Sequence, residues 1–364
     1  LAESLQHGPD PPSPGQDLAT AGQVIQEHLV DLLGEFPPEH EQVHLLVQAK
    51  TPAVQVGRAH RGPHSVHLDA LGVQDGAQTL EDPHAGPQHP GVVVIYDDQF
   101  NYLTKMCLTR MREAAFAMTK IAKLRGCKVA IFSSDASDHI EEYFRHGADY
   151  VICGEAEETL QHLMENLLRN SGSPVESIQG LAFMKGHEVV RTAPRKILEN
   201  LDLLPFPAWD LVEFERYREA WMQKHGYFSL NMVTTRGCPF HCNWCAKPIY
   251  GQVYHSRSPE NVVEEMLALR ETANPDHMWF ADDIFGLKPG WISRFDELVN
   301  ARNAAISFKC LSRADLLLKE DNIRHLRNAG CHTVWIGAES GSQKVLDAME
   351  KGTTVEQIYE ATSL

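Results

Sequence analysis

The first 90 residues differ from the rest of the chain in their pattern of apolar and polar positions. Residues 1–90 contain no Cys, Met, Trp or Tyr and a single Phe, Phe36, and they are rich in His, Gln, Pro and Gly. Apolar residues recur at helical spacing only over residues 18–36. Because such a composition cannot bury a sizeable core, we predict that residues 1–90 are a low-complexity segment, either disordered or a non-native sequence joined to the protein that follows.

Short apolar runs rich in β-branched residues begin at Gly91 and alternate with helical patterns. Alternation of this kind predicts parallel βαβ units, which bind ligands beyond the carboxyl ends of their strands. We therefore predict an α/β domain over residues 91–170. Its expected strands are 92–98, 128–134 and 149–155, and its expected helices are 103–124, 140–144 and 159–168.

The next segment, residues 171–226, reads as a connector between two domains. Residues 180–190 have the pattern of a hairpin that turns at Lys185-Gly186. Two prolines within residues 205–210 restrict the backbone there to an extended path. The connector is thus expected to be ordered and packed.

A second series of strand–helix units occupies residues 227–364. The series predicts a partial (β/α) barrel of the TIM type, in which functional residues gather where strands end. A helix is expected to begin at Ser258-Pro259, since Ser is a favoured cap and Pro is tolerated in the first turn. The other expected elements are strands at 231–237, 277–283, 307–313 and 333–340, and helices at 291–302, 319–328 and 342–349.

Polar side chains follow three of these four strands. Asp282 and Asp283 follow the second strand, Arg313 follows the third, and Glu339 and Ser340 follow the fourth. Salt bridges and helix caps at a barrel rim would also use such residues. Their coincidence with a cysteine-rich loop after the first strand indicates a functional site at this edge.

That loop reads RGCPFHCNWCA over residues 236–246. Cys238, Cys242 and Cys245 have the spacing C-x3-C-x2-C, which is one thiolate short of a zinc site or a fully ligated iron–sulfur cube. Three thiolates can hold a [4Fe–4S] cube and leave one iron open to an external ligand. The site is therefore predicted to be a cluster with an open iron.

Two alternatives to an open cluster are a zinc knuckle that uses His241 and a cluster completed by Cys310 or Cys331. A zinc knuckle is disfavoured because the sequence has no second ligand pair at normal spacing. A completed cluster is disfavoured because the two further cysteines lie in or before predicted strands, as buried apolar residues do.

Composition and charge exclude some classes of function and some cellular settings. The formal net charge of −16 argues against charge-driven nucleic-acid binding, so a small-molecule substrate is expected and nucleic acid is not. No run of 18 apolar residues is present to span a membrane. The chain shows no secretion signal, and its eight cysteines read as reduced thiols, so we expect a cytoplasmic, oxygen-poor setting.

The stretches RGCPFHCNWCAKPIYG, SRSPENVVEEM, WFADDIF, CLSRADLL and WIGAESGSQKVLDAMEKG resemble the radical S-adenosylmethionine (SAM) superfamily. Within it they are similar to the group with an N-terminal cobalamin-binding domain, which includes methyltransferases and the anaerobic magnesium-protoporphyrin ester cyclase. The similarity covers residues 92–364, and an aromatic residue before the third cysteine, here Trp244, is usual in the superfamily.

The resemblance implies that Cys238, Cys242 and Cys245 ligate a [4Fe–4S] cluster that cleaves SAM reductively to a 5′-deoxyadenosyl radical. Cobalamin-dependent methyl transfer or cyclisation at an unactivated carbon would follow, with an electron donor such as flavodoxin or ferredoxin. The implied SAM contacts are the amino group with Asp282 and Asp283, a carboxylate of SAM or of substrate with Arg313, and the ribose hydroxyls with Glu339 and Ser340.

The resemblance also sets expectations for the fold. Residues 91–170 resemble the later half of a cobalamin-binding Rossmann-like domain, although the cobalt-ligating motif D-x-H-x-x-G does not occur. Residues 227–364 resemble a radical SAM barrel, which usually has six strands. With four recognisable strands, the chain is expected to be a fragment truncated at its C-terminus.

Two rival functions remain open at this point. A methylthiotransferase uses the same three-cysteine loop but adds a second cluster on three more cysteines, and Cys107, Cys127 and Cys153 lie on separate predicted elements. A non-catalytic iron–sulfur or corrinoid redox module is the other rival. A cluster that responds to SAM would exclude the redox module.

Overall fold

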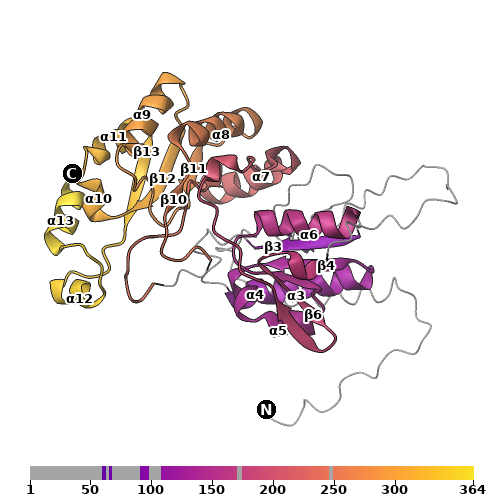
Figure 1. The fold of residues 1–364 in the computed structure, drawn as a ribbon. Coiled ribbons are helices and arrows are strands. Elements are labelled where there is room, and N and C mark those ends of the chain that lie inside the picture. Colours follow the sequence, from indigo (N-terminus) through magenta and orange to yellow (C-terminus); the bar gives the residue numbers. More distant parts are fainter. Residues whose placement is uncertain (1–59, 63–64, 68–90, 98–107, 170–173, 246–248) are drawn as a thin grey trace, which may run out of the picture.

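The structure is a computed structural model that describes residues 60–62, 65–67, 91–97, 108–169, 174–245 and 249–364 (Figure 1). Within residues 1–90 it describes one small antiparallel pair, β1 (His60–Gly62) and β2 (Ser65–His67). The helix expected within residues 18–36 and the start of the helix expected at residue 103 lie outside the described residues. The same is true of Cys107.

The upstream sheet has the strand order β3-β4-β5-β6-β7. Its first three strands are parallel, as the alternating pattern predicts, and the last two are antiparallel. The hairpin that the sequence places in the connector therefore extends this sheet. The strands are β3 (Val92–Tyr96), β4 (Lys128–Phe132), β5 (Tyr150–Ile152), β6 (Leu181–Lys185) and β7 (Glu188–Arg191).

Helices cover both faces of the upstream sheet (Figure 1). Val93, Ile95 and their same-face neighbours pack against one group of helices, whereas Val92 and Val94 pack against another. Strands that are buried on both faces read as continuous apolar runs, which explains the sequence VVVIY. The first group comprises α3 (Leu108–Leu124), α4 (Ser134–Asp138) and α5 (Ile140–Arg145), and the other face is covered by α6 (Glu157–Arg169).

The connector is ordered and packs on the second domain. It contains a helix that the apolar pattern did not reveal, α7 (Phe214–His225), which ends at Gly226 in the left-handed conformation with φ 76°. Phe214 is buried in the downstream core, and the guanidinium of Arg218 lies over the ring of Phe228. Packing therefore fixes this helix, whose own sequence is mostly polar.

The downstream sheet is entirely parallel and has the strand order β13-β12-β11-β8. Each strand lies beside the next one along the chain, as in a (β/α) barrel, so the predicted fold class is confirmed. The strands are β8 (Ser229–Met232), β11 (His277–Phe280), β12 (Ser307–Ser312) and β13 (Cys331–Ile336). A short antiparallel pair, β9 (Thr235–Arg236) with β10 (His255–Ser256), flanks the cysteine loop.

One face of this sheet is buried against helices. Met278, Phe280 and Phe308 are completely buried in that core, and each buried side chain of this size contributes roughly 1.5–3 kcal/mol. Ser258 caps the first helix by accepting a hydrogen bond from the Asn261 N–H at 3.1 Å, as predicted. The helices are α8 (Pro259–Thr272), α9 (Trp291–Ala301), α10 (Ala314–Leu317), α11 (Asn322–Asn328), α12 (Gln343–Ala348) and α13 (Val355–Ser363). Among the described residues, no helix has the length and apolar character needed to cross a bilayer.

Candidate cofactor site at the three-cysteine loop

The three cysteines occupy the loop between β9 and β10, beyond the carboxyl end of β8. Cys238 and Cys242 are half-buried, whereas Cys245 is exposed. The side chain of Trp244 is 54% exposed, so the aromatic residue before the third cysteine faces outward rather than into a core. The loop therefore presents its thiols at the edge of the parallel sheet where a ligand can approach them.

Asp282, at the end of β11, holds the backbone that leads into this loop. One carboxylate oxygen accepts the N–H groups of Thr234 and Thr235 at 2.7 and 2.8 Å, and the other accepts the Thr234 hydroxyl at 2.6 Å. Asp282 is completely buried, and burial raises its pKa to about 6, although the three hydrogen bonds oppose this rise. All of the Asp282 contacts in the structure are thus with the chain itself, and a contact with SAM remains a prediction.

Gly237 is required by the path of the loop. It has a φ of 77°, and a Cβ at this position would lie 2.2 Å from the carbonyl oxygen of Val253. No side chain fits there without displacing the backbone before β10. The glycine that precedes Cys238 therefore lets the cysteine loop lie against the neighbouring strand.

Arg236 joins the start of the loop to the upstream domain. Its guanidinium donates to the carboxylate of Glu155 at 2.8 Å and also pairs with Glu157. Glu155 follows β5, and Glu157 is the first residue of α6. Arg236 and Glu155 are both buried, at 8% and 6% exposure, so this ion pair is shielded from water. The carboxyl end of the upstream sheet is thereby fixed beside the cysteine loop.

Arg313, at the end of β12, supports the loop from the other side. Its guanidinium stacks over the ring of Phe240 in the loop, 3.5 Å from the centroid. It also donates to the Lys351 carbonyl oxygen at 3.0 Å and to the Asp315 carboxylate at 2.9 Å. These contacts use several of the hydrogen-bond donors of the guanidinium. Its predicted pairing with a carboxylate of SAM or substrate remains a prediction.

Lys351, which the sequence did not predict as a site residue, contacts both Arg313 and Glu339. Its ammonium donates to the Glu339 carboxylate at 2.9 Å, while its backbone accepts from Arg313. The Ser340 hydroxyl accepts from the Ser342 N–H at 3.1 Å. Asp283 is exposed. The structure thus gathers Arg313 and Glu339 around Lys351, and the ribose contacts predicted for Glu339 and Ser340 remain predictions.

The cysteine loop also contacts the end of α12. The Asn243 N–H donates to the Met349 carbonyl oxygen at 3.1 Å, and the Asn243 side chain donates to the Ala348 carbonyl oxygen at 2.7 Å. Carbonyl groups at the end of a helix lack partners within the helix. Asn243 supplies such partners, and the loop is therefore held at the ends of β8, β11, β12 and the helix after β13.

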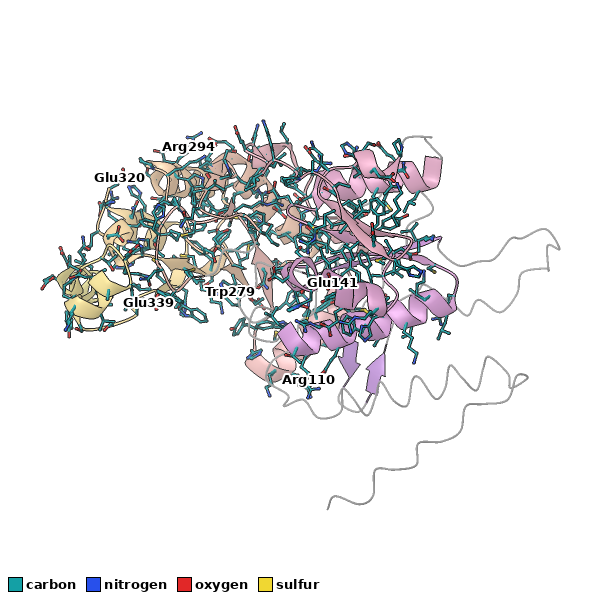
Figure 2. The ribbon with its side chains drawn as sticks, turned by 60° about the horizontal axis from the view of Figure 1, so that its bottom comes forward. Arg110, Glu141, Trp279, Arg294, Glu320 and Glu339 are labelled. Carbon is teal, nitrogen blue, oxygen red and sulfur yellow. The ribbon has the colours of Figure 1, made fainter. Side chains whose placement is uncertain are left out.

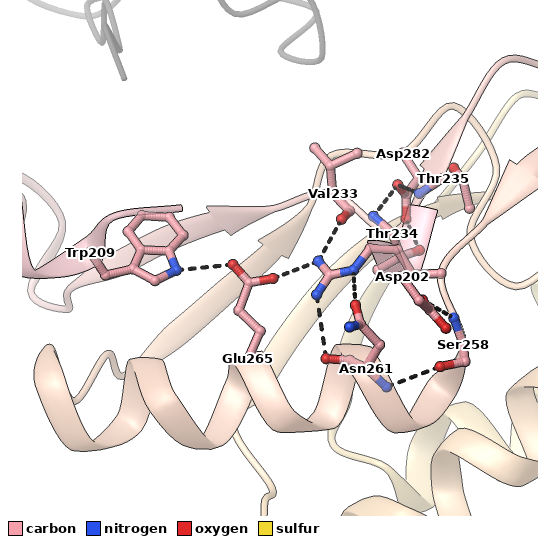
Figure 3. A network of polar contacts seen from close by, with 10 residues as sticks. Asp202, Trp209, Val233, Thr234, Thr235, Ser258, Asn261, Glu265 and Asp282 are labelled. Carbon is pink, nitrogen blue, oxygen red and sulfur yellow. Dashed lines mark hydrogen bonds and ion pairs between the residues drawn. The ribbon is translucent and has the colours of Figure 1, made fainter. Parts of the chain in front are cut away.

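Arg257, which is mostly shielded from solvent, anchors the end of β8 (Figure 3). It donates to the Val233 carbonyl oxygen at 3.1 Å and to the Asn261 side chain at 2.6 Å, and it pairs with Glu265. The other Glu265 oxygen accepts the Trp209 indole N–H at 2.9 Å. This network, from the connector to the strand end, keeps the backbone that precedes the cysteines in place.

The donor set fits an open [4Fe–4S] cube better than zinc. In the part of the chain that the structure describes, no three His, Cys, Asp or Glu side chains converge on one ion position, as a zinc knuckle would require. Thiolates on a cube bind different irons and need not converge. Cys310 is buried in the downstream core, and Cys331 packs against that core. Neither is on the loop, so the three loop cysteines remain the predicted ligands of a cluster.

Comparison with known proteins agrees with this arrangement. Residues 232–364 match the family model of the radical SAM superfamily. This range runs from the end of β8 through α13 and contains the cysteine loop, Asp282, Arg313 and Glu339. The downstream unit of the chain is therefore similar to a radical SAM domain.

The chain is also similar to a named methyltransferase and to a named cyclase. An uncharacterized methyltransferase of Pyrococcus horikoshii is 30% identical over 58% of this chain and 45% of its own length. The anaerobic magnesium-protoporphyrin IX monomethyl ester cyclase of Synechocystis is 25% identical over 59% of this chain and 42% of its own length. The chain thus spans less than half the length of either relative.

A solved structure shares the fold of both units. The cobalamin-dependent SAM radical enzyme OxsB, solved with aqua-cobalamin and SAM bound, superposes with a TM-score of 0.58 at 21% identity. The match covers 75% of this chain and 38% of that chain. An α/β domain followed by a partial (β/α) barrel therefore also occurs within part of the OxsB structure.

Proposed function

We propose that the chain is part of a radical SAM enzyme that carries out cobalamin-dependent methyl transfer or cyclisation at an unactivated carbon of a small molecule. The observation that carries this proposal is the placement of Cys238, Cys242 and Cys245 at the carboxyl edge of the downstream sheet, fixed against the upstream domain by Arg236. The family match and the named relatives support it.

The cysteines would hold a [4Fe–4S] cluster through three irons, and such a cluster supplies the electron that cleaves bound SAM to methionine and a 5′-deoxyadenosyl radical. The chain itself supplies orientation. Asp282 and Gly237 fix the backbone on either side of Arg236, and Arg313 packs on Phe240. Asp282, Asp283, Arg313, Glu339 and Ser340 remain our candidates for direct contacts with SAM.

The upstream domain is proposed to bind cobalamin at the carboxyl ends of its parallel strands, where open α/β sheets bind ligands. Gly154, two residues after the end of β5, has a φ of 85° and no atom within 4 Å of the position of a Cβ. Its neighbour Glu155 pairs with Arg236. A ligand held at this edge would therefore lie on the side of the domain that faces the cysteine loop.

Methylthiolation is the weaker candidate. It requires a second cluster on three further cysteines, but Cys127 is buried before β4 and Cys153 follows β5. Burial raises the pKa of both thiols, which disfavours the thiolate needed to bind iron. We retain an electron donor such as flavodoxin or ferredoxin, a cytoplasmic setting and independence of nucleic acid as parts of the proposal.

Electron paramagnetic resonance of the full chain tests the proposal. The protein is reconstituted anaerobically with iron and sulfide, reduced with dithionite and measured with and without SAM. We expect a [4Fe–4S]⁺ signal that changes on addition of SAM, disappears in Cys242→Ala and persists in the control Cys331→Ala. A signal that SAM does not change would support a redox module, and a signal that survives in Cys242→Ala would refute the ligand assignment.

A further inference from the structure

The face of the downstream sheet opposite its helix-covered core carries two tryptophans and a lysine. Trp279 on β11 lies directly opposite Lys309 on β12, and Leu311 lies opposite Trp335 on β13. Met278, Phe280, Phe308 and Cys310 alternate with these residues and enter the helix-covered core. Figure 2 labels Trp279 among the side chains of the downstream unit.

The lysine ammonium is held between the two rings. Its Nζ lies 4.0 Å from the centroid of the Trp279 ring and 4.8 Å from that of Trp335. The two ring centroids are 5.6 Å apart, and the ring planes are inclined at 60°. Contact with two indole faces is a favourable setting for a cation, because the ring faces carry negative electrostatic potential.

This composition differs from that of a packed barrel interior, where branched aliphatic residues predominate. Burial lowers the pKa of Lys309, which shows that the ammonium gives up hydration at this position. Within the described ranges, no carboxylate forms an ion pair with it. The side chain of Trp335 is 41% exposed, so one ring of the cluster remains accessible.

We propose that Trp279, Lys309 and Trp335 form the substrate subsite of the enzyme proposed above, and that this subsite takes a planar ring system bearing an anionic group. The inference rests on that proposed function, since the inward face of a (β/α) barrel leads to the carboxyl edge where the cysteine loop lies. The exposed Trp335 ring stacks on the substrate ring, and Lys309 pairs with the anion.

The chemistry of the cluster selects this class of substrate. An aliphatic substrate would not use the stacking surface of Trp335, and a neutral one would bury the lysine ammonium without a counter-charge, which is costly. A planar anion satisfies both groups at once. A further polypeptide segment lying over the two tryptophans is the competing occupant, and the experiment below separates it from a small molecule.

Binding of 1-naphthoate to the full chain, measured by calorimetry without cluster or SAM, tests this inference. We expect 1-naphthoate to bind at least about tenfold more tightly than either 1-naphthamide, which lacks the charge, or cyclohexanecarboxylate, which lacks the planar ring. Equal binding of the three compounds would overturn the inference. No binding of 1-naphthoate, together with protection of Trp335 from acrylamide quenching, would indicate a polypeptide occupant and would also overturn it.

Variants locate the binding to the cluster. Lys309→Met, which keeps an unbranched apolar stem, is expected to weaken 1-naphthoate binding at least about tenfold, whereas Lys309→Arg keeps most of it. Lys319→Met removes an exposed lysine and is the matched control, with affinity unchanged. If Lys309→Met fails to fold by circular dichroism, Trp335→Leu replaces it, because that side chain is partly exposed. Wild-type affinity in a folded Lys309→Met or Trp335→Leu protein would refute the assignment.

Different measurements would refute the proposed radical SAM function and the proposed substrate subsite. A SAM-responsive cluster signal combined with 1-naphthoate binding that does not depend on Lys309 would leave the proposed function standing and remove the subsite. The opposite combination would establish a planar-anion site in a chain that is not a radical SAM enzyme. Because 1-naphthoate binding is measured without the cluster, failed reconstitution cannot imitate failure of the subsite.

Discussion

The guanidinium of Arg236 and the carboxylate of Glu155 form a buried ion pair across the two domains, 2.8 Å apart and separated by 81 residues in sequence. Arg236 lies two residues before the first cysteine, and Glu155 lies three residues after the end of β5. A buried ion pair adds little net stability over an apolar pair, but its directional hydrogen bonds fix geometry. We infer that this pair holds the upstream domain in register with the cysteine loop.

Removal of the arginine alone should be strongly destabilising, because it leaves a buried carboxylate without its counter-charge. We expect Arg236→Met to lower the free energy of unfolding by about 3 kcal/mol, measured by urea denaturation. Arg294→Met is the control, since Arg294 is half-exposed and pairs with Glu260 and Glu297. Its loss should cost less than about 1 kcal/mol.

The effect of the pair can be separated from a general loss of packing. Glu155→Gln keeps the size of the side chain and its acceptor oxygen for the Leu198 N–H, while removing the charge. If Arg236 is held by charge, the double variant Arg236→Met/Glu155→Gln should be more stable than Arg236→Met alone. Additive losses in the double variant would contradict the ion-pair explanation.

Gly237 provides a second test of the loop. Gly237→Ala would place a methyl group 2.2 Å from the Val253 carbonyl oxygen, so the backbone before β10 must move. We expect the variant to fold but to retain less than about half of the iron of the wild type after reconstitution. Gly251→Ala is a matched control, because Gly251 also has a positive φ, of 65°, but has open space around its Cβ position. Equal iron loss in both variants would attribute the effect to backbone strain alone.

The sequence predicted the elements well where apolar periodicity was strong. The strands at 277–280 and 307–312 and the helix begun by Ser258 lie where the pattern placed them. The helix at 214–225 was missed because its sequence is mostly polar, and packing against the downstream core decides its structure. The sequence also did not predict that the hairpin of β6 and β7 extends the upstream sheet, since the pairing of β6 with β5 is a long-range contact.

The sequence predicted which residues carry the chemistry of the site, but not which residues hold the cysteine loop in place. Cysteine spacing alone predicted the three ligands, because three thiols within eight residues have few other uses, and this assignment stays a prediction. No local sequence pattern, however, predicts that Arg236 pairs with a glutamate 81 residues upstream. Nor does any pattern predict that Lys351 contacts both Arg313 and Glu339. Such partners depend on how the strand ends meet in space.

His277 offers a test by pH. Burial, together with the positive charges of Lys309 and His332, lowers its pKa from 6.5 to about 4. The folded state therefore binds a proton less readily than the unfolded state, and stability is present above pH 6.5 and lost as the pH falls toward 4. We expect wild type to lose about 1–2 kcal/mol more than His277→Gln between pH 7 and pH 4.5, after allowance for partial solvent screening.

The comparison for His277 is the difference in the free energy of unfolding between the two proteins, measured with urea at each pH. Gln retains an acceptor for the Ser229 hydroxyl, which lies 2.9 Å from the imidazole Nδ1. His187→Gln serves as the control, because His187 is exposed and is not among the groups that lower the pKa of His277. A constant difference for His277→Gln would show that the imidazole is solvated in the folded state.

Asp282 should change the stability of the fold with pH in the direction opposite to His277, over nearly the same pH range. Burial raises its pKa from 3.8 to about 6, so the folded state binds a proton more readily than the unfolded state. Stability due to this group is complete below pH 3.8 and is lost as the pH rises toward 6. Relative to wild type, Asp282→Asn should therefore gain up to about 3 kcal/mol between pH 4 and pH 7, since a tenfold change in proton affinity corresponds to about 1.4 kcal/mol.

Urea denaturation at several pH values measures this gain, with Asp283→Asn as the control because that neighbour is exposed. The amide oxygen of Asn can accept the Thr234 and Thr235 N–H groups, so the hydrogen bonds to the backbone survive the substitution. A gain that rises with pH would show that burial dominates at Asp282. A difference that falls with pH would instead show that the three hydrogen bonds outweigh burial, and that Asp282 stabilises the loop as a carboxylate at neutral pH.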